Sequence, residues 1–245
     1  KARVNQRQLW CNVVLFRELP EMLQADLHHQ VYLPTLTKHP FFYQYNCFNV
    51  AGMRMICHRA VHEVSLVPEQ QLFAYGQVAE CMFFSLDGVL NYVTHDLFNR
   101  DNNATVESGS WFSEAAIWVR WFYMGKIVSH NFAMLISLSS KDLHKSLQNY
   151  VDMLPPCGQY AKSFSSTIAG VALSDESDVS DLWGDFDTLQ WMVQRAFAPV
   201  QEGDKGRRTT RKTFSVLRGS ISGGSGGNRG MSIRQAMRAS LNSAS

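Results

Sequence analysis

No apolar run in this 245-residue sequence approaches the ~18–20 residues that a membrane-spanning helix needs. The richest stretch, residues 115–128, is interrupted by Arg120 and Lys126. No signal peptide is recognisable, and because the sequence begins with Lys1 we expect it to be a piece of a longer protein. We therefore expect that nothing within these residues crosses a bilayer by itself.

Cysteine is also sparse. The number of cysteines is odd, and no two of them are arranged as Cys-x-x-Cys. This usage is typical of a reducing, cytosolic compartment, where free thiols pack as small hydrophobic groups. The five cysteines are Cys11, Cys47, Cys57, Cys81 and Cys157.

Motifs that would indicate an enzyme are missing as well. The sequence has no P-loop, no dinucleotide-binding fingerprint and no paired-carboxylate arrangement. His58 and His62 have the spacing of two metal ligands on one helix, but the same face carries Arg54 and no third ligand. We therefore predict no catalytic residue, no metal site and no required cofactor.

The net charge of +2 conceals an acidic body and a basic tail. Residues 1–202 carry 14 Lys/Arg and 20 Asp/Glu, whereas residues 203–245 carry 9 Lys/Arg and Asp204 alone. An acidic folded part argues against nucleic acid as a partner. The tail is rich in Gly, Ser and Arg and is predicted to be disordered. It is a candidate site for anionic lipid or for kinases that read upstream basic residues, or else an inert solubilising tail. The candidate phosphorylation sites are Thr210, Thr213 and Ser215.

Residues 1–45 are predicted to be helical. Pro20 suits the first turn of a helix, because the N–H that proline lacks is not needed there. Pro34 and then Pro40 are predicted to end that helix. Residues 47–63 are predicted to form a further helix. The expected buried stripe of the first helix repeats every four residues and consists of Leu19, Leu23, Leu27 and Val31.

The pattern then changes to short segments rich in β-branched and aromatic residues, which predict strands. Asp87-Gly88 between two of them predicts a two-residue hairpin, because type I′ turns need positive φ at both positions. Residues 95–103 are predicted to be a polar loop. The expected fold class is α+β, with an antiparallel, jelly-roll-like β-roll of about eight short strands between N-terminal and C-terminal helices. The predicted strands cover residues 64–67, 71–75, 81–86, 89–94, 126–131 and 132–138.

Helical patterns return after the last predicted strand. Ser139 and Asp142 form a capping box that marks a helix start, and Pro155-Pro156 is predicted to stop that helix. Residues 174–187 contain six Asp/Glu and are predicted to be an exposed linker. The predicted C-terminal helices cover residues 139–154, 158–171 and 185–197.

Several short motifs occur in a fixed order along residues 15–170: Leu15-Phe16-Arg17-Glu18-Leu19-Pro20, His39-Pro40-Phe41-Phe42, Val67-Pro68-Glu69, Ala74-Tyr75-Gly76 and Trp111-Phe112-Ser113-Glu114. Together they resemble the cyclic-nucleotide-binding domain family. The earliest motifs are similar to the C-terminal part of the C-linker of voltage-gated channels in the hyperpolarisation-activated, cyclic-nucleotide-gated and ether-à-go-go groups. The domains implied are C-linker-like helices at 1–45, a cyclic-nucleotide-binding-homology domain at 46–172, an acidic linker and extra helix at 173–202, and the tail at 203–245.

The resemblance implies a cyclic-phosphate site at Phe112-Ser113-Glu114. In the family a glycine stands where Ser113 is, the glutamate accepts a hydrogen bond from the ribose, and an arginine grips the phosphate. The positions aligned with that arginine motif are Tyr123-Met124-Gly125, so its bidentate phosphate bonds are lost. Arg120 and Lys126, each three residues away, remain as substitutes. We expect a degenerate site with weak or no binding of cAMP or cGMP. The candidate ligand-binding residues are Phe112, Ser113, Glu114, Tyr123, Met124 and Lys126.

Three further interpretations stay open at this stage. Glu114 is either the ribose-binding glutamate or a helix-start carboxylate that caps nearby N–H groups. The large side chains at 118 and 121–124 either cover the roll or fill the vacant pocket as an intrinsic ligand, as in the ether-à-go-go group. The turn at Pro68-Glu69-Gln70 lacks the family's glycine and is expected to be type I.

The sequence thus predicts the cytoplasmic regulatory module of a cation channel, on the cytosolic face of a membrane. The resemblance implies a homo- or heterotetramer with other channel subunits. Two alternatives remain: a working cAMP or cGMP sensor, and a soluble kinase-regulatory or scaffold protein with the same roll.

Overall fold

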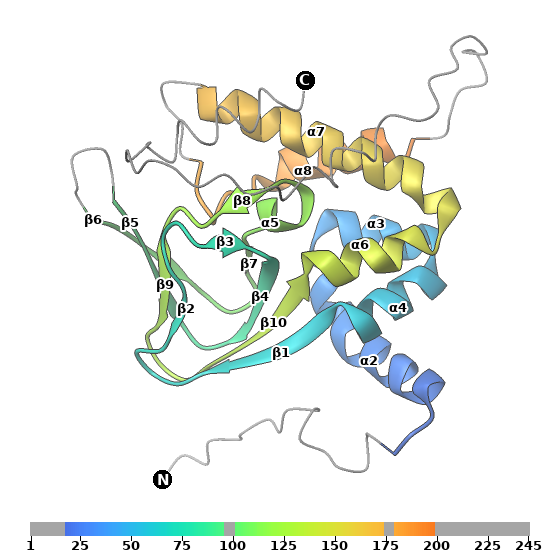
Figure 1. Ribbon diagram of the computed structural model, residues 1–245, viewed down its shortest axis with the longest axis horizontal. Coiled ribbons are helices and arrows are strands. Elements are labelled where there is room, and N and C mark those ends of the chain that lie inside the picture. The colour runs from blue at the N-terminus through green and yellow to red at the C-terminus, as the bar shows by residue number, and fades with distance from the viewer. Residues whose placement is uncertain (1–17, 96–100, 174–178, 199–245) are drawn as a thin grey trace, which may run out of the picture. The chain divides into compact units, whose positions relative to one another are not determined.

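The computed structural model describes residues 18–95, 101–173 and 179–198 (Figure 1). These residues belong to one unit, Lys1–Phe197, except for Ala198, which begins a second unit, Ala198–Ser245. The basic tail and its candidate phosphorylation sites therefore lie outside the described residues. Among the residues described, no helix is both long and apolar enough to span a membrane.

The first described helix, α2 (Glu21–Leu36), begins directly after Pro20, as predicted. It buries Ala25, Tyr32 and Leu36 rather than the predicted stripe, and Leu23 is 50% exposed. Pro34 does not end the helix but lies inside its last turn.

The predicted helix over residues 47–63 is wrong at both ends. Helix α3 (Pro40–Phe48) and helix α4 (Val50–Arg59) are separate, and Asn49 caps the second by accepting a hydrogen bond from Gly52 N–H. Residues 61–66 are already strand β1, which pairs with the last strand of the roll. His58 and His62 are therefore on different elements.

Ten strands in the described residues form the β-roll, and every pairing is antiparallel. One sheet has the order β1-β10-β4-β7, a second has the order β2-β9-β5-β6, and β3 pairs with β8 alone. The predicted α+β class, with an antiparallel roll between helices, is confirmed (Figure 1). The bounds are β1 (Val61–Leu66), β2 (Gln71–Phe73), β3 (Val78–Ala79), β4 (Cys81–Asp87), β5 (Leu90–His95), β6 (Asp101–Val106), β7 (Trp111–Phe112), β8 (Trp121–Phe122), β9 (Lys126–Ser129) and β10 (Ala133–Ser139).

Asp87-Gly88 turns the chain but does not form a hairpin. The strands on either side, β4 and β5, belong to different sheets, so the chain crosses from one sheet to the other at this point. Gly88 has φ +90°, and a Cβ there would lie 2.6 Å from the Phe132 carbonyl oxygen. The glycine is thus required by close packing against the start of β10 as well as by its backbone conformation.

Two other turn predictions also need correction. Gln70 N–H donates to the Val67 carbonyl (3.1 Å), and Glu69 has φ 63°. A positive φ at the third position of a turn is that of type II, not of the expected type I. Part of the loop predicted at 95–103 is strand β6, which pairs with β5, while residues 96–100 lie outside the described residues.

The C-terminal helices are α6 (Ser140–Gln148), α7 (Leu154–Leu173) and α8 (Phe186–Ala196), with a 3₁₀ turn, η2 (Val151–Met153), before α7. The N-cap is confirmed, since Ser139 Oγ accepts from Asp142 N–H, but the reciprocal bond of a capping box is not made, because Ser139 N–H donates to the Ala60 carbonyl. Pro155 and Pro156 lie in the first turn of α7, where their missing N–H groups cost nothing, and so they start a helix rather than stop one. Phe41 joins these helices to α3, because its ring contacts Trp118, Tyr160 and Phe197.

Candidate functional site

The turn that follows β7 presents its backbone to the interior of the roll. Ser113 has φ 60° and is 1% exposed, so this serine adopts the left-handed conformation that ordinarily favours glycine. Its N–H donates to the backbone carbonyl of Asp181 (2.6 Å). Ser113 therefore does not hinder close approach to its N–H, and the group that approaches comes from this chain.

The carboxylate of Asp181 lies in a nest of four donors. Trp121 Nε1 donates to Oδ1 (2.7 Å), while Tyr92 Oη (2.9 Å), Met124 N (2.8 Å) and Gly125 N (3.0 Å) all donate to Oδ2. We call these four groups the anion nest. Met124 and Gly125 belong to the segment aligned with the family's phosphate-binding arginine motif. The backbone of this segment therefore binds a carboxylate that belongs to the chain itself.

Close packing brings the two backbone donors of the nest against the roll. A Cβ on Gly125 would lie 2.5 Å from the ring of Tyr92 and 2.7 Å from the Val93 carbonyl oxygen. Any larger residue at 125 would push the segment away from β5 and misplace its N–H. Glycine at position 125 therefore allows the Met124 and Gly125 N–H groups to lie close to β5.

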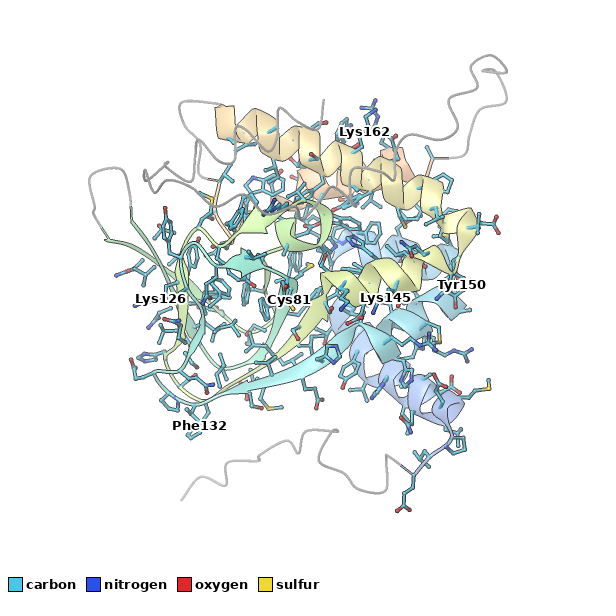
Figure 2. All side chains as sticks on the ribbon, in the orientation of Figure 1. Cys81, Lys126, Phe132, Lys145, Tyr150 and Lys162 are labelled. Carbon is cyan, nitrogen blue, oxygen red and sulfur yellow. The ribbon has the colours of Figure 1, made fainter. Side chains whose placement is uncertain are left out.

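The anion nest contains no cation. Arg120 is exposed and its guanidinium lies 5.6 Å from the centre of the Phe122 ring, and Lys126 is exposed at the start of β9 (Figure 2). Neither residue is among the donors to Asp181. Burial raises the pKa of the Asp181 carboxyl above its ordinary value, and the hydrogen bonds from Trp121 and the other nest donors oppose that rise.

Glu114 does not have the helix-capping role that was considered for it. It is 1% exposed and makes no capping bond with its own helix, α5 (Ala115–Trp118). Instead it accepts from Trp118 Nε1 (2.9 Å) and Tyr160 Oη (2.8 Å) through Oε1, and from His39 Nε2 (2.9 Å) through Oε2. These donors come from α5, α7 and the residue that caps α3. Glu114 therefore connects α5, α7 and the residue that caps α3.

His39 has a defined tautomer at this junction. Its Nδ1 accepts from Phe41 N–H (3.2 Å), which completes the cap of α3. We assign the ring proton to Nε2, because that nitrogen faces the carboxylate of Glu114. The side chains of both residues are fully buried.

The aromatic cluster is packed against other parts of the protein. Trp118 and Trp121 are buried and donate to Glu114 and Asp181. Tyr123 stacks on Phe73, with ring centres 3.7 Å apart and an interplanar angle of 3°. Phe112, from the predicted site, packs against Phe83 of β4 (5.3 Å) and supports the turn from behind.

Asp181 is the site residue that sequence reasoning missed. The linker was expected to be exposed, yet Asp181 is 1% exposed, while residues 174–178 lie outside the described residues. One signal was available: Leu182-Trp183 is a pair of large apolar residues in an otherwise acidic stretch. Such a pair indicates a segment that docks on the protein, and it singles out the adjacent carboxylate. In the part of the chain that is described, no cluster of His, Cys, Asp and Glu has the geometry of a metal site.

Comparisons with known proteins give structural neighbours only. No family model matches the chain, and no curated protein matches its sequence. The regulatory subunit of a cAMP-independent protein kinase A from Trypanosoma cruzi, bound to guanosine, is 13% identical over 61% of this chain and 52% of its own, with a TM-score of 0.44. The match therefore spans about half of that subunit.

Two bacterial structures are similar to the same degree. The sensor domain of the transcriptional regulator DNR from Pseudomonas aeruginosa is 14% identical over 63% of this chain and 98% of its own (TM-score 0.45). A cyclic nucleotide-binding-like protein from Brucella abortus is 16% identical over 44% of this chain and 97% of its own (TM-score 0.37). At these identities the likeness concerns the fold alone.

Proposed function

We propose that this chain is the cytoplasmic regulatory module of a cation channel, in which a β-roll of the cyclic-nucleotide-binding type works without binding cyclic nucleotide. It is not an enzyme. It acts by favouring one conformation of the pore over another, within a homo- or heterotetramer on the cytosolic face of a membrane.

One observation supports the proposal that the roll binds no cyclic nucleotide: Asp181 fills the anion nest. A tethered carboxylate has a high effective concentration, commonly about millimolar, so a free nucleotide must bind tightly to displace it. The nest offers that nucleotide no arginine, and Glu114 is already engaged by three donors. Charge-assisted bonds contribute about 1.5–3 kcal/mol each, so a nucleotide that lacks one or two of them would bind about ten- to several-thousand-fold more weakly.

The channel context rests on the similarity of residues 15–42 to a C-linker. Helix α2 belongs to that segment and carries exposed apolar side chains, Met22 (68%) and Leu23 (50%), as a helix that contacts a neighbouring subunit would. We further propose that the tail beyond residue 203 binds anionic lipid at the membrane surface or is phosphorylated at Thr210, Thr213 or Ser215.

Calorimetry with the 245-residue chain tests the ligand part. Titration with cAMP and with cGMP to millimolar concentration should give no binding heat. Micromolar binding to the wild-type chain would show instead that nucleotide displaces Asp181, and this part of the proposal would be wrong. Electrophysiology tests the channel part: cells expressing the natural full-length protein should carry a cation current whose gating is insensitive to cytosolic nucleotide and altered by Asp181→Ala. If the full-length protein gives no current and its gene encodes no membrane spans, the channel assignment fails.

A working cyclic-nucleotide sensor is the second candidate, either in a channel or in a soluble kinase-regulatory or scaffold protein. The observation that favours it is the survival of the backbone donors at residues 113, 124 and 125, all of which are engaged by Asp181. The same calorimetric titration separates the two candidates.

A further inference from the structure

The segment around Asp181 is held as a peptide, not only as a carboxylate. On the two sides of its side chain, Asp181 N–H donates to Tyr92 Oη (3.2 Å) and the Asp181 carbonyl accepts from Ser113 N–H (2.6 Å). Tyr92 therefore contacts this one residue twice, once as an acceptor and once as a donor. A site that binds only a small anion has no use for bonds to the backbone of its ligand.

A second anchor lies two residues further along. The ring of Trp183 meets the ring of Phe164 edge to face, with centres 5.6 Å apart, on helix α7. Between the anchors the segment is a tight turn, in which Trp183 N–H donates to the Ser180 carbonyl (3.1 Å) and Leu182 N–H to Ser180 Oγ (3.2 Å). An acidic anchor and an aromatic anchor at fixed spacing are what a short linear motif presents to its receptor.

The donor set of the nest matches this kind of ligand. All four donors are uncharged, and a carboxylate with two oxygens satisfies all of them at once. The carboxylate brings a single negative charge, so it needs no arginine to be held in a buried place where four hydrogen bonds replace its water.

We propose that this face of the roll is a receptor for acidic peptides that contain Asp-Leu-Trp, and that residues 180–183 are its ligand in cis. A partner protein that carries such a segment displaces residues 180–183 from the site. The linker between α7 and α8 is then no longer anchored to the roll. The inference rests on the proposed function, because it assigns a ligand to the nest that nucleotide is proposed not to enter.

A double variant of the full chain, Asp181→Asn with Trp183→Ala, weakens both anchors and should open the site. The probe is a fluorescein-labelled peptide with the sequence of residues 179–185, followed by fluorescence anisotropy. The matched control is Asp185→Asn with Trp191→Ala, which makes the same two substitutions at positions that are exposed and outside the site.

The double variant should bind the peptide at least tenfold more tightly than the control chain does. A peptide with Asn in place of the Asp that corresponds to Asp181 should bind at least tenfold more weakly. Equal binding by both chains, or no discrimination against the Asn peptide, would overturn the proposal.

The wild-type chain gives an independent readout that does not depend on the folding of a variant. In a ¹⁵N-labelled sample, millimolar unlabelled peptide should shift the indole N–H resonance of Trp183 towards its free position. The indole N–H of Trp121 should stay in its hydrogen-bonded position, because a new carboxylate replaces the old one. If saturating peptide moves neither resonance, the receptor proposal is wrong. Binding of cyclic nucleotide to the double variant or to the control chain would count against the proposed function. If neither nucleotide nor peptide binds, that result would count against this inference alone.

Discussion

Asp181→Ala should be among the most destabilising single substitutions in the roll. The change leaves the four donors of the anion nest without their acceptor. Tyr92 can turn its hydroxyl towards another acceptor, but Trp121 Nε1–H and Gly125 N–H are fixed by buried groups. An unsatisfied buried donor costs about 1–3 kcal/mol, and the loss of a buried charge returns part of that cost. We therefore expect a loss of about 3–4 kcal/mol in the free energy of unfolding, equivalent to a fall of about 10 °C in Tm for a domain of this size.

Urea unfolding of the full chain, followed by near-ultraviolet circular dichroism, measures this loss. Asp185→Ala is the matched control, because Asp185 is an exposed aspartate four residues away whose side chain caps α8 through Thr188 N–H (3.0 Å). Loss of such a cap costs about 1 kcal/mol. If Asp181→Ala is no more destabilising than Asp185→Ala, the nest does not depend on its carboxylate and the reasoning is refuted.

Two further perturbations test the same physical account. Ser113→Gly should raise the free energy of unfolding in urea by about 1 kcal/mol. The change relieves a positive φ and removes an Oγ that is buried without a partner among the described residues. Glu69→Gly, which changes an exposed residue with positive φ, should raise it by less. Burial, together with the nearby His58 and His62, lowers the pKa of His28 to about 4. Because protonation therefore favours the unfolded chain, stability should be complete above pH 6.5 and fall as the pH drops from 6.5 towards 4, by about 1–2 kcal/mol once solvent screening of this half-exposed ring is allowed for. His28→Asn should flatten unfolding curves recorded across that pH range, and an unchanged pH profile in the variant would contradict this assignment.

Local chemistry decided which elements could be predicted from the sequence. The start of α6 was predicted because Ser139 caps the helix through a residue three positions ahead. The start of α8 was predicted too, and in the structure Asp185 caps it in the same way. The errors arose where one signal has two meanings. Proline both ends helices and begins them, so Pro155 and Pro156 were misassigned. Asp87-Gly88 requires a turn, but whether that turn joins neighbouring strands depends on β10, which pairs with β4 from more than forty residues away.

Only part of the candidate site could be predicted from the sequence. The turn at 112–114 and the segment at 123–125 were located through the family resemblance, but their ligand was not. Asp181 lies 56 residues from Gly125 and 89 from Tyr92 along the chain. No periodicity or spacing links residues at that separation. The acidic composition of the linker predicted exposure, and a count of charges cannot single out the one carboxylate, Asp181, that is buried.

The position of Glu114 next to Ser113 suggests how occupancy of the nest reaches the N-terminal helices. One peptide unit separates the N–H that holds the Asp181 backbone from the side chain that holds His39. His39 Nδ1 accepts the capping bond of α3 from Phe41 N–H, and the Nε2 of the same ring donates to Glu114. If the segment at 181 leaves, the Ser113 N–H loses its acceptor, and the strained turn has a reason to relax towards negative φ. That relaxation would swing Glu114 and loosen the cap of α3 and the bond to Tyr160 together. The Asp181 backbone is therefore connected to α3 and α7 through this turn, because its carbonyl binds Ser113 N–H and the neighbouring Glu114 binds His39 and Tyr160.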